Sequence, residues 1–263
     1  MTEDRSSSGD PAATLRLLWR AQAPPEGRAR RGPRRGTSVD AVVAAAVALA
    51  DEEGIAAVTM RQLADRLGVG PMSVYTYVPG RAELLDLMLD DAYARMPRHQ
   101  HDARPWQQRV RTVADDNHAL YTRHPWAAHV STLRPPLGPG QMGKYAHELA
   151  AFTGSGLDDL QIDDALTLLL TFVRANARDS SDASHTRQAN NDDDQSWWHT
   201  VGPLLADVLD TDTYPLASRI GAAAGAAHAS AHDPGHAYTF GLDRIIDALA
   251  HLVSTSHSPA PPR

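Results

Sequence analysis

Residues 59–78 are the stretch that most limits what this chain can fold into. They read TMRQLADRLGVGPMSVYTYV. Thr59 can cap the start of a helix, because its hydroxyl can accept a hydrogen bond from a backbone N–H of the first turn. Gly68 can end that helix in the left-handed conformation, and Pro71 suits the first turn of a second helix. The sequence therefore predicts two short helices joined by a turn centred on glycine.

The second of these helices has no full apolar stripe. Val74 and Val78 lie four residues apart and face inward, which leaves small, hydroxyl and aromatic groups on the outer face. A short helix with such groups suits the major groove of DNA, and two helices joined by a tight glycine turn form the helix-turn-helix pattern. An ordinary helical hairpin is the alternative interpretation.

The segments on either side extend this pattern. Residues 39–50 predict an amphipathic helix upstream, and residues 84–89 predict another apolar-faced helix downstream. With these flanks, the chain resembles the tetracycline-repressor (TetR) family of transcriptional regulators over residues 38–95. The resemblance is carried by AAVALADEEG (45–54), VTMRQLA (58–64), LGV (67–69), VYTYV (74–78) and GRAELL (80–85).

Geometry and the resemblance together assign candidate DNA contacts. Arg61 is the candidate for a base contact, because arginine can bind guanine O6 and N7 with two hydrogen bonds. Thr59, Tyr77 and Arg81 are expected to hold phosphates, which fixes the register of the protein on DNA. Tyr75 has an alternative role, since the matching tyrosine of the family often packs partly against the DNA-binding domain. The candidates on the second helix are Pro71, Met72, Ser73, Tyr75, Thr76 and Tyr77.

A basic segment precedes the first helix of this domain. Residues 28–35 hold five arginines and no acid, and neighbouring prolines and glycines favour an extended or disordered chain. We expect a flexible arm over residues 1–37 in which Arg31, Arg34 and Arg35 contact phosphates or enter the minor groove. A solvated tail that aids solubility is the alternative. Within the arm, residues 15–19 either dock on the body as a helical turn or stay mobile.

Composition narrows the class of protein. The net charge of −7 argues against indiscriminate nucleic-acid binding by the whole surface. The chain has no cysteine for a disulfide or a Cys-based zinc site, no apolar run near the roughly 20 residues of a membrane helix, and no signal-peptide layout at its start. We therefore expect a cytoplasmic protein.

The sequence contains no recognisable catalytic or cofactor motif. An enzyme is the rival class, yet the sequence has no glycine-rich phosphate loop, G-x-S-x-G elbow or H-E-x-x-H motif. The 13 histidines show no ligand set with a cysteine or a third close carboxylate. We predict no catalysis, no metal and no cofactor.

The remainder of the chain stays helical in pattern, with no alternating strands. The prediction is an all-α fold with a three-helix helix-turn-helix domain at residues 38–95, a larger helical body at 96–255 and a disordered tail at 256–263. Residues 179–195 are polar with almost no apolar residue and predict a mobile loop. Helices are expected at about residues 106–121, 141–152, 157–178, 197–208 and 237–253.

The body resembles the branch of the family with the tetracycline-repressor type of C-terminal domain, through Trp106, RHPW (123–126), RPPLGP (134–139) and YTFGLDR (238–244). The resemblance implies a homodimer formed by a four-helix bundle of about residues 158–178 and 236–253 from each subunit. Wide apolar faces on both segments support this, and a purely intramolecular core is the alternative. A two-fold dimer would read an inverted-repeat operator in double-stranded DNA.

The resemblance also implies a small-molecule pocket inside the body. A ligand shifts the spacing of the two DNA-binding domains only if its affinity differs between the two dimer shapes. A tetracycline–magnesium pocket fits poorly, because Val130 stands where a tetracycline repressor carries its metal-binding histidine. The predicted function is a repressor released by a ligand; the alternative is a DNA-binding dimer controlled by a protein partner or by abundance. Candidate pocket residues are His118, Trp126, His129, Met142, Tyr145, Phe172 and Asn176.

Overall fold

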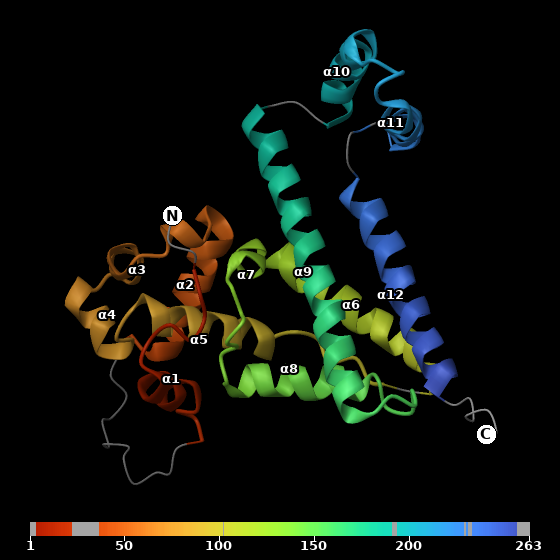
Figure 1. Cartoon of the computed structure of the whole chain (residues 1–263). Helices are drawn as coiled ribbons and strands as arrows, with labels where there is room; N and C mark the ends of the chain where they lie inside the picture. The colour runs from red at the N-terminus through yellow and green to blue at the C-terminus, as the bar shows by residue number, and fades with distance from the viewer. Residues whose placement is uncertain are drawn as a thin grey trace, which may run out of the picture.

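A computed structural model gives the fold and describes residues 4–22, 37–101, 103–190, 194–228, 230 and 233–256. Helices dominate these ranges, and the extended pairing in them is a single isolated bridge between Arg5 and Ser131. The all-α prediction is confirmed (Figure 1). None of the helices described there is both long enough and apolar enough to cross a membrane.

The capping residues predicted from the sequence define the helices of the helix-turn-helix domain. Thr59 caps its helix, since its hydroxyl oxygen accepts from the Gln62 N–H at 3.2 Å. Gly68 ends the same helix with φ 66° and ψ 33°, and Pro71 opens the next. Val74 and Val78 are fully buried, as predicted. The elements are α2 (Val39–Glu53), the 3₁₀ turn η2 (Ile55–Ala57), α3 (Met60–Leu67), α4 (Pro71–Tyr77) and α5 (Arg81–Ala94).

The body is helical, and α5 runs from the helix-turn-helix domain to its α8 (Figure 1). Its α8 packs directly on α5: Gly140 lies so close to the backbone of Asp90 that any Cβ would overlap it. The long α9 and α12 run side by side against α6. The elements are α6 (Trp106–Arg123), α7 (Pro125–His129), α8 (Pro139–Ala150), α9 (Asp159–Asn190), α10 (Asp194–Val208), α11 (Pro215–His228) and α12 (Pro234–Ser256).

The predicted mobile loop at residues 179–195 is wrong over most of its length. Helix α9 continues through it to Asn190, and α10 begins at Asp194. The segment lacks an apolar stripe, but it also lacks glycine and proline before residue 191. A helix already formed over twenty residues extends by one hydrogen bond for each added residue, so it needs no apolar face to continue.

The flexible arm expected over residues 1–37 also needs correction. Residues 11–18 form α1 (Pro11–Leu18), which packs against α5 with Leu18 only 3% exposed. Asp10 caps this helix by accepting from the Ala12 N–H at 2.9 Å. The docked helical turn is therefore the correct alternative for residues 15–19. The basic stretch at 28–35, with Arg31, Arg34 and Arg35, lies outside the described residues.

Candidate nucleic-acid interface and ligand cavity

Helix α4 presents a mixed polar and apolar face to solvent. Met72 is 77% exposed and Tyr75 is 45% exposed, while Val74 between them is buried in the domain core. The Thr76 hydroxyl donates to the Met72 carbonyl at 3.2 Å, which leaves its methyl group and oxygen on the surface. Pro71 and Ser73 are exposed as well, and Tyr77 is half-buried. The structure therefore brings the α4 candidates together on one accessible helix.

The two arginines of α3 differ in whether their side chains are already paired within the protein. Arg66 donates to both carboxylate oxygens of Glu52, at 2.7 and 2.6 Å, and this ion pair lowers the pKa of Glu52. Arg61 is exposed and forms no ion pair or side-chain hydrogen bond with the described residues. Thr59 is exposed but its hydroxyl is shared with Gln62. Arg61 is thus the α3 cation available for a base edge.

Arg81 is not placed as a phosphate contact. Its guanidinium turns inward and donates to the backbone carbonyls of Val58 and Ile55, the latter at 3.1 Å. Nη2 also donates to both carboxylate oxygens of Asp4, each at 2.9 Å. Geometry and the family resemblance predict a phosphate ligand, but three neighbouring acceptors hold the side chain, which is 35% exposed, against the protein in this conformation.

The N-terminal segment that supplies Asp4 also reaches the body. We call residues 4–10 the N-terminal strap. The Ser6 N–H donates to the Ser131 carbonyl at 3.0 Å, and the Ser131 N–H donates back to the Asp4 carbonyl at 2.9 Å. The Ser7 hydroxyl donates to the Pro135 carbonyl at 3.2 Å. The strap therefore links the loop at residues 131–137 to the helix-turn-helix domain.

On the other side, the strap is anchored along α5. The Ser7 N–H donates to Oδ1 of Asp86 at 2.8 Å, and the Asp10 N–H donates to Oε1 of Glu83 at 3.1 Å. Asp86 is fully buried, and this burial raises its pKa to about 6. The strap thus touches α5 at three successive places, from Arg81 to Asp86.

A cavity of about 330 Å³ lies within the body, beside this loop. We call it the body cavity. Its wall combines apolar side chains with hydroxyl groups and two cations, a composition that suits a small molecule with an aromatic or aliphatic frame and polar substituents. The lining residues are Tyr93 of α5, Tyr121 of α6, Thr132, Leu133 and Pro135 of the loop, Gln141, Lys144 and Tyr145 of α8, and Leu166, Thr167, Leu170, Thr171 and Arg174 of α9.

Lys144, the single lysine of the sequence, is buried at this cavity. Its ammonium group donates to Glu148 at 2.8 Å and lies 5.3 Å from the centre of the Tyr93 ring. Burial lowers the pKa of Lys144, and the Glu148 carboxylate opposes this effect. Asn117 donates to the same carboxylate at 2.6 Å, but its own side-chain oxygen has no partner among the described residues. A buried polar network therefore borders the cavity.

Comparisons with known proteins identify the family of this chain. The family described as bacterial regulatory proteins, tetR family, matches residues 42–88, and the tetracyclin repressor-like C-terminal domain matches residues 97–253. The HTH-type transcriptional repressor DrrR1 of Streptomyces coeruleorubidus is 35% identical over 98% of this chain and 93% of its own length. The chain belongs to the TetR family. It is accordingly a DNA-binding transcriptional regulator.

Solved structures of TetR proteins share the fold. ActR of Streptomyces coelicolor in complex with actinorhodin superposes with a TM-score of 0.69 at 27% identity, over 82% of this chain and 96% of that one. ActR in complex with (S)-DNPA gives a TM-score of 0.67 at 27% identity, over 81% and 96%. The recognised TetR resemblance and the predicted helix-turn-helix domain are both confirmed.

Of the seven pocket candidates predicted from sequence, one lines the body cavity and six do not. Tyr145 lines the body cavity and donates to Asp163 at 2.6 Å. Trp126 is buried instead at the junction with the DNA-binding domain, where its indole N–H donates to Asp51 at 2.7 Å. Met142 lies on the outer face of α8, 42% exposed. These two residues do not line the body cavity because their helices turn them away from it.

The other four candidates also lie outside the body cavity. His118 and Phe172 pack on the ring of Tyr238, with centroids 4.6 and 6.1 Å away, so they join α6, α9 and α12. Asn176 donates to the Pro234 carbonyl at 2.7 Å, and His129 lies 4.0 Å from Asp182. Sequence reasoning missed the cavity residues Tyr93, Tyr121, Lys144 and Arg174. The one available signal was that Lys144 is the only lysine beside many arginines.

Proposed function

We propose that this regulator represses transcription as a homodimer on an inverted-repeat operator, and that a small molecule in the body cavity releases it. The proposal is carried by α5. Arg81 at the start of α5 follows the recognition helix α4 directly, and Tyr93 near its end lines the body cavity. A rigid helix of this length spans about 20 Å, so a ligand that displaces the Tyr93 end moves the end beside α4.

The strap supplies a second connection between the same two places. Thr132 and Pro135 line the body cavity, and the Ser131 and Pro135 backbone bonds hold their loop to the strap. Asp4 of the strap in turn holds Arg81. Ligand contacts with this loop therefore act on the DNA-binding domain through a short chain of hydrogen bonds.

Exposed apolar side chains on α9 and α12 support the dimer. Leu160 and Leu168 of α9 are 71% and 51% exposed, and Phe240 of α12 is 57% exposed. Leu160 and Leu168 are eight residues apart and so share one face of α9. A subunit that leaves these groups in water gains free energy by covering them with the same helices of a second copy.

The effector has a frame of roughly the size of a few fused or linked rings, with hydroxyl or acidic groups that meet Arg174 and the phenols. Arg174 is half-buried, and its Nη1 donates to the Thr132 hydroxyl at 2.7 Å, which leaves further donors free for a ligand. Actinorhodin, the compound bound in the related ActR structure, is the first probe to try.

Fluorescence anisotropy on duplex DNA from just upstream of the protein's own gene tests the proposal. Tight binding of two subunits per duplex, but not to a scrambled duplex, is expected. Actinorhodin should then release the protein from DNA. Gln141→Trp, which fills the body cavity, should abolish release but not DNA binding, whereas Met142→Trp on the outer face of the same helix should leave both intact.

Two outcomes would contradict parts of this proposal. Release that persists unchanged in Gln141→Trp would place the effector elsewhere. Sequence-specific binding that no tested compound reverses would favour a DNA-binding dimer without a small-molecule ligand.

A further inference from the structure

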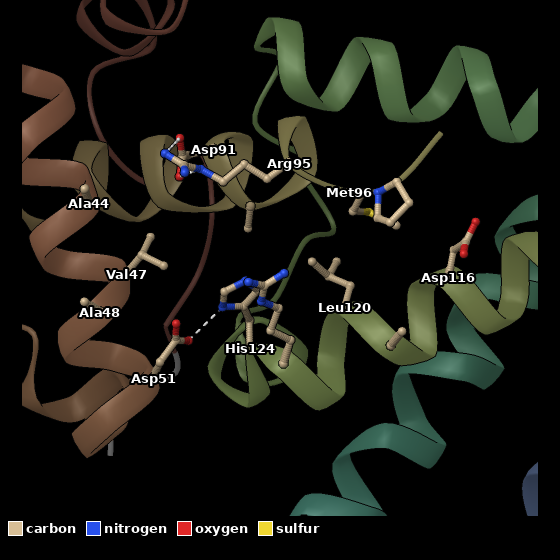
Figure 2. A pocket seen from close by; sticks show the side chains of 14 residues that line it. Ala44, Val47, Ala48, Asp51, Asp91, Arg95, Met96, Asp116, Leu120 and His124 are labelled. Atoms are coloured by element: carbon tan, nitrogen blue, oxygen red, sulfur yellow. Dashed lines mark hydrogen bonds and ion pairs between the residues drawn. The ribbon is translucent and has the colours of Figure 1, made fainter. Parts of the chain in front are cut away.

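A second cavity, of about 530 Å³, lies between the DNA-binding domain and the body. We call it the junction cavity. Helices α2 and α6 form opposite walls, and the end of α5 closes it across the top (Figure 2). Its volume falls within the range of about 300–1,000 Å³ that is usual for small-molecule sites. No residue that lines the junction cavity lines the body cavity.

Eight of the fourteen residues that line the junction cavity are apolar, and four of these are alanines. Alanines come from all three helices: two from α2, one from α5 and one from α6. The alanines lie on helix faces that oppose each other across the junction cavity. An aromatic ring system can therefore enter the slot between these faces without displacing bulky side chains. Such a ring would contact the larger apolar groups at the edges. The apolar lining residues are Ala44, Val47, Ala48, Ala92, Met96, Pro97, Ala119 and Leu120.

Fixed carboxylates set the charge of the slot. Asp51 lies at one end and accepts from His124 Nδ1 at 2.8 Å and from the Trp126 indole at 2.7 Å (Figure 2). Asp116 lies towards the other end and is held by His99 Nδ1 at 2.9 Å, with its side chain only 14% exposed. Hydrogen bonds from the two histidine rings fix the positions of both carboxylates in the cavity wall.

The cations of the cavity do not offset these carboxylates. Arg95 is neutralised by Asp91 through two hydrogen bonds of 2.7 and 3.0 Å. Arg123 is exposed at the edge and has long rotatable bonds, so its head can move into water when a cation enters. The charges held in place are therefore those of Asp51 and Asp116.

We propose that the junction cavity is a binding site for a small planar organic cation, an aromatic ring system that carries an amine or amidine. The rings lie between α2 and α6, and the positive group meets the carboxylate of Asp51 or Asp116. A partly desolvated carboxylate binds a cation more strongly than one in bulk water, because the local dielectric constant is lower. This site is separate from the effector site proposed above and does not depend on it.

A ligand in the junction cavity would change the affinity for DNA, because the cavity is formed by both domains. One wall belongs to α2 of the DNA-binding domain and the other to α6 of the body. A bound ligand contacts both walls only in the domain arrangement seen here. Its affinity and that of DNA are therefore linked by the same change of arrangement.

The test uses the full-length protein without DNA, since flat cations also bind DNA. The probe is 9-aminoacridine, whose fluorescence anisotropy reports binding, and the matched anion is anthracene-9-carboxylate with the same three-ring size. Saturable binding of 9-aminoacridine and at least tenfold weaker binding of the anion are expected. Ala48→Leu and Ala119→Leu, which fill the slot from opposite walls, should each weaken 9-aminoacridine at least tenfold, and Asp116→Asn should weaken it several-fold.

Gln141→Trp, which fills the body cavity, is the control and should leave 9-aminoacridine binding unchanged. The proposal fails if wild-type protein does not bind 9-aminoacridine. It fails equally if Gln141→Trp removes binding while both alanine variants keep it, or if the anion binds as well as the cation. Thermal melting of each variant confirms that the protein is folded, and two filling variants on separate helices keep the test decisive if one of them unfolds.

Discussion

Asp4 holds Arg81 through both carboxylate oxygens, each 2.9 Å from Nη2. This ion pair joins the N-terminal strap to the first turn of the helix that follows α4. The family resemblance predicts a phosphate contact for Arg81. We therefore predict that the strap competes with DNA for this one cation, so that breaking the ion pair changes DNA affinity.

Replacing Asp4 with Asn should release Arg81 toward DNA. We expect tighter operator binding and a plot of log K against log salt that is steeper by roughly one, since each neutralised phosphate contributes about 0.9 to this slope. Asp65→Asn is the control, because it removes the same charge from an exposed position on α3. Equal slopes for the two variants would mean that general charge, and not Arg81, is responsible.

Arg61→Ala should weaken specific binding by roughly 1–3 kcal/mol and relax the preference at one base position. The reason is that Arg61 is the exposed α3 arginine with no ion-pair partner among the described residues. Arg66→Ala is the matched control, since Arg66 is already paired with Glu52. Binding selections on randomised half-sites measure the effect; a specificity profile that Arg61→Ala does not alter would contradict a base contact.

The basic stretch makes a separate prediction. Changing all five arginines of residues 28–35 to Gln removes charge and leaves α1 and the strap in place. We expect weaker DNA binding and a shallower salt dependence, because fewer counterions are released. A salt slope equal to that of the wild-type protein would show that this stretch does not contact DNA. Deleting the whole N-terminus would be less informative, since it also removes Asp4.

The helix-turn-helix domain was predictable because its rules are local. The cap at Thr59, the left-handed Gly68 and the first-turn Pro71 each act within a few residues, and each is found as expected. The strap is the opposite case. Ser6 is hydrogen-bonded to Ser131, 125 positions away in the sequence, and no local pattern in either segment indicates this partner. The extent of α9 differs from the prediction for another reason: a polar segment predicts a loop, but residues 179–190 contain no helix-breaking glycine or proline.

The candidate sites divide in the same way. Exposure of the α4 side chains follows from the helical period, so the candidate DNA contacts on its solvent-facing side could be named from sequence. A cavity depends on where several helices end up relative to one another. Trp126 and Tyr145 are both large aromatic residues on helices of the body, yet one is buried at the domain junction and the other lines the body cavity. Residue type alone does not separate them.

A charged residue introduced into the proposed apolar dimer face tests the dimer. Leu168→Glu places a carboxylate among the exposed apolar groups of α9 and α12, where a partner's helices would have to desolvate it. We expect monomers in analytical ultracentrifugation and loss of operator binding. Leu133→Glu, at a loop position that is 90% exposed, is the control and should remain dimeric. A Leu168→Glu protein that sediments as a dimer would rule out this face.

Asp86 makes the stability of the strap depend on pH. Its carboxylate is fully buried, Oδ1 accepts from Ser7, and Oδ2 has no partner among the described residues. Desolvation raises its pKa to about 6 from the ordinary value of 3.8. Between these two pH values the folded protein holds a proton that the unfolded chain has lost. The free energy of unfolding should therefore fall as pH rises through this window, and the full penalty is present above about pH 6.

Asp86→Asn tests this directly, because Asn keeps an oxygen that can accept from the Ser7 N–H but carries no charge. A shift of about two pKa units corresponds to about 3 kcal/mol at most. We expect the stability of the variant relative to wild type to improve by about 1–3 kcal/mol between pH 4 and pH 7.5, as measured by urea unfolding. A difference that stays constant over this range would show that Asp86 has the same pKa in the folded and unfolded states.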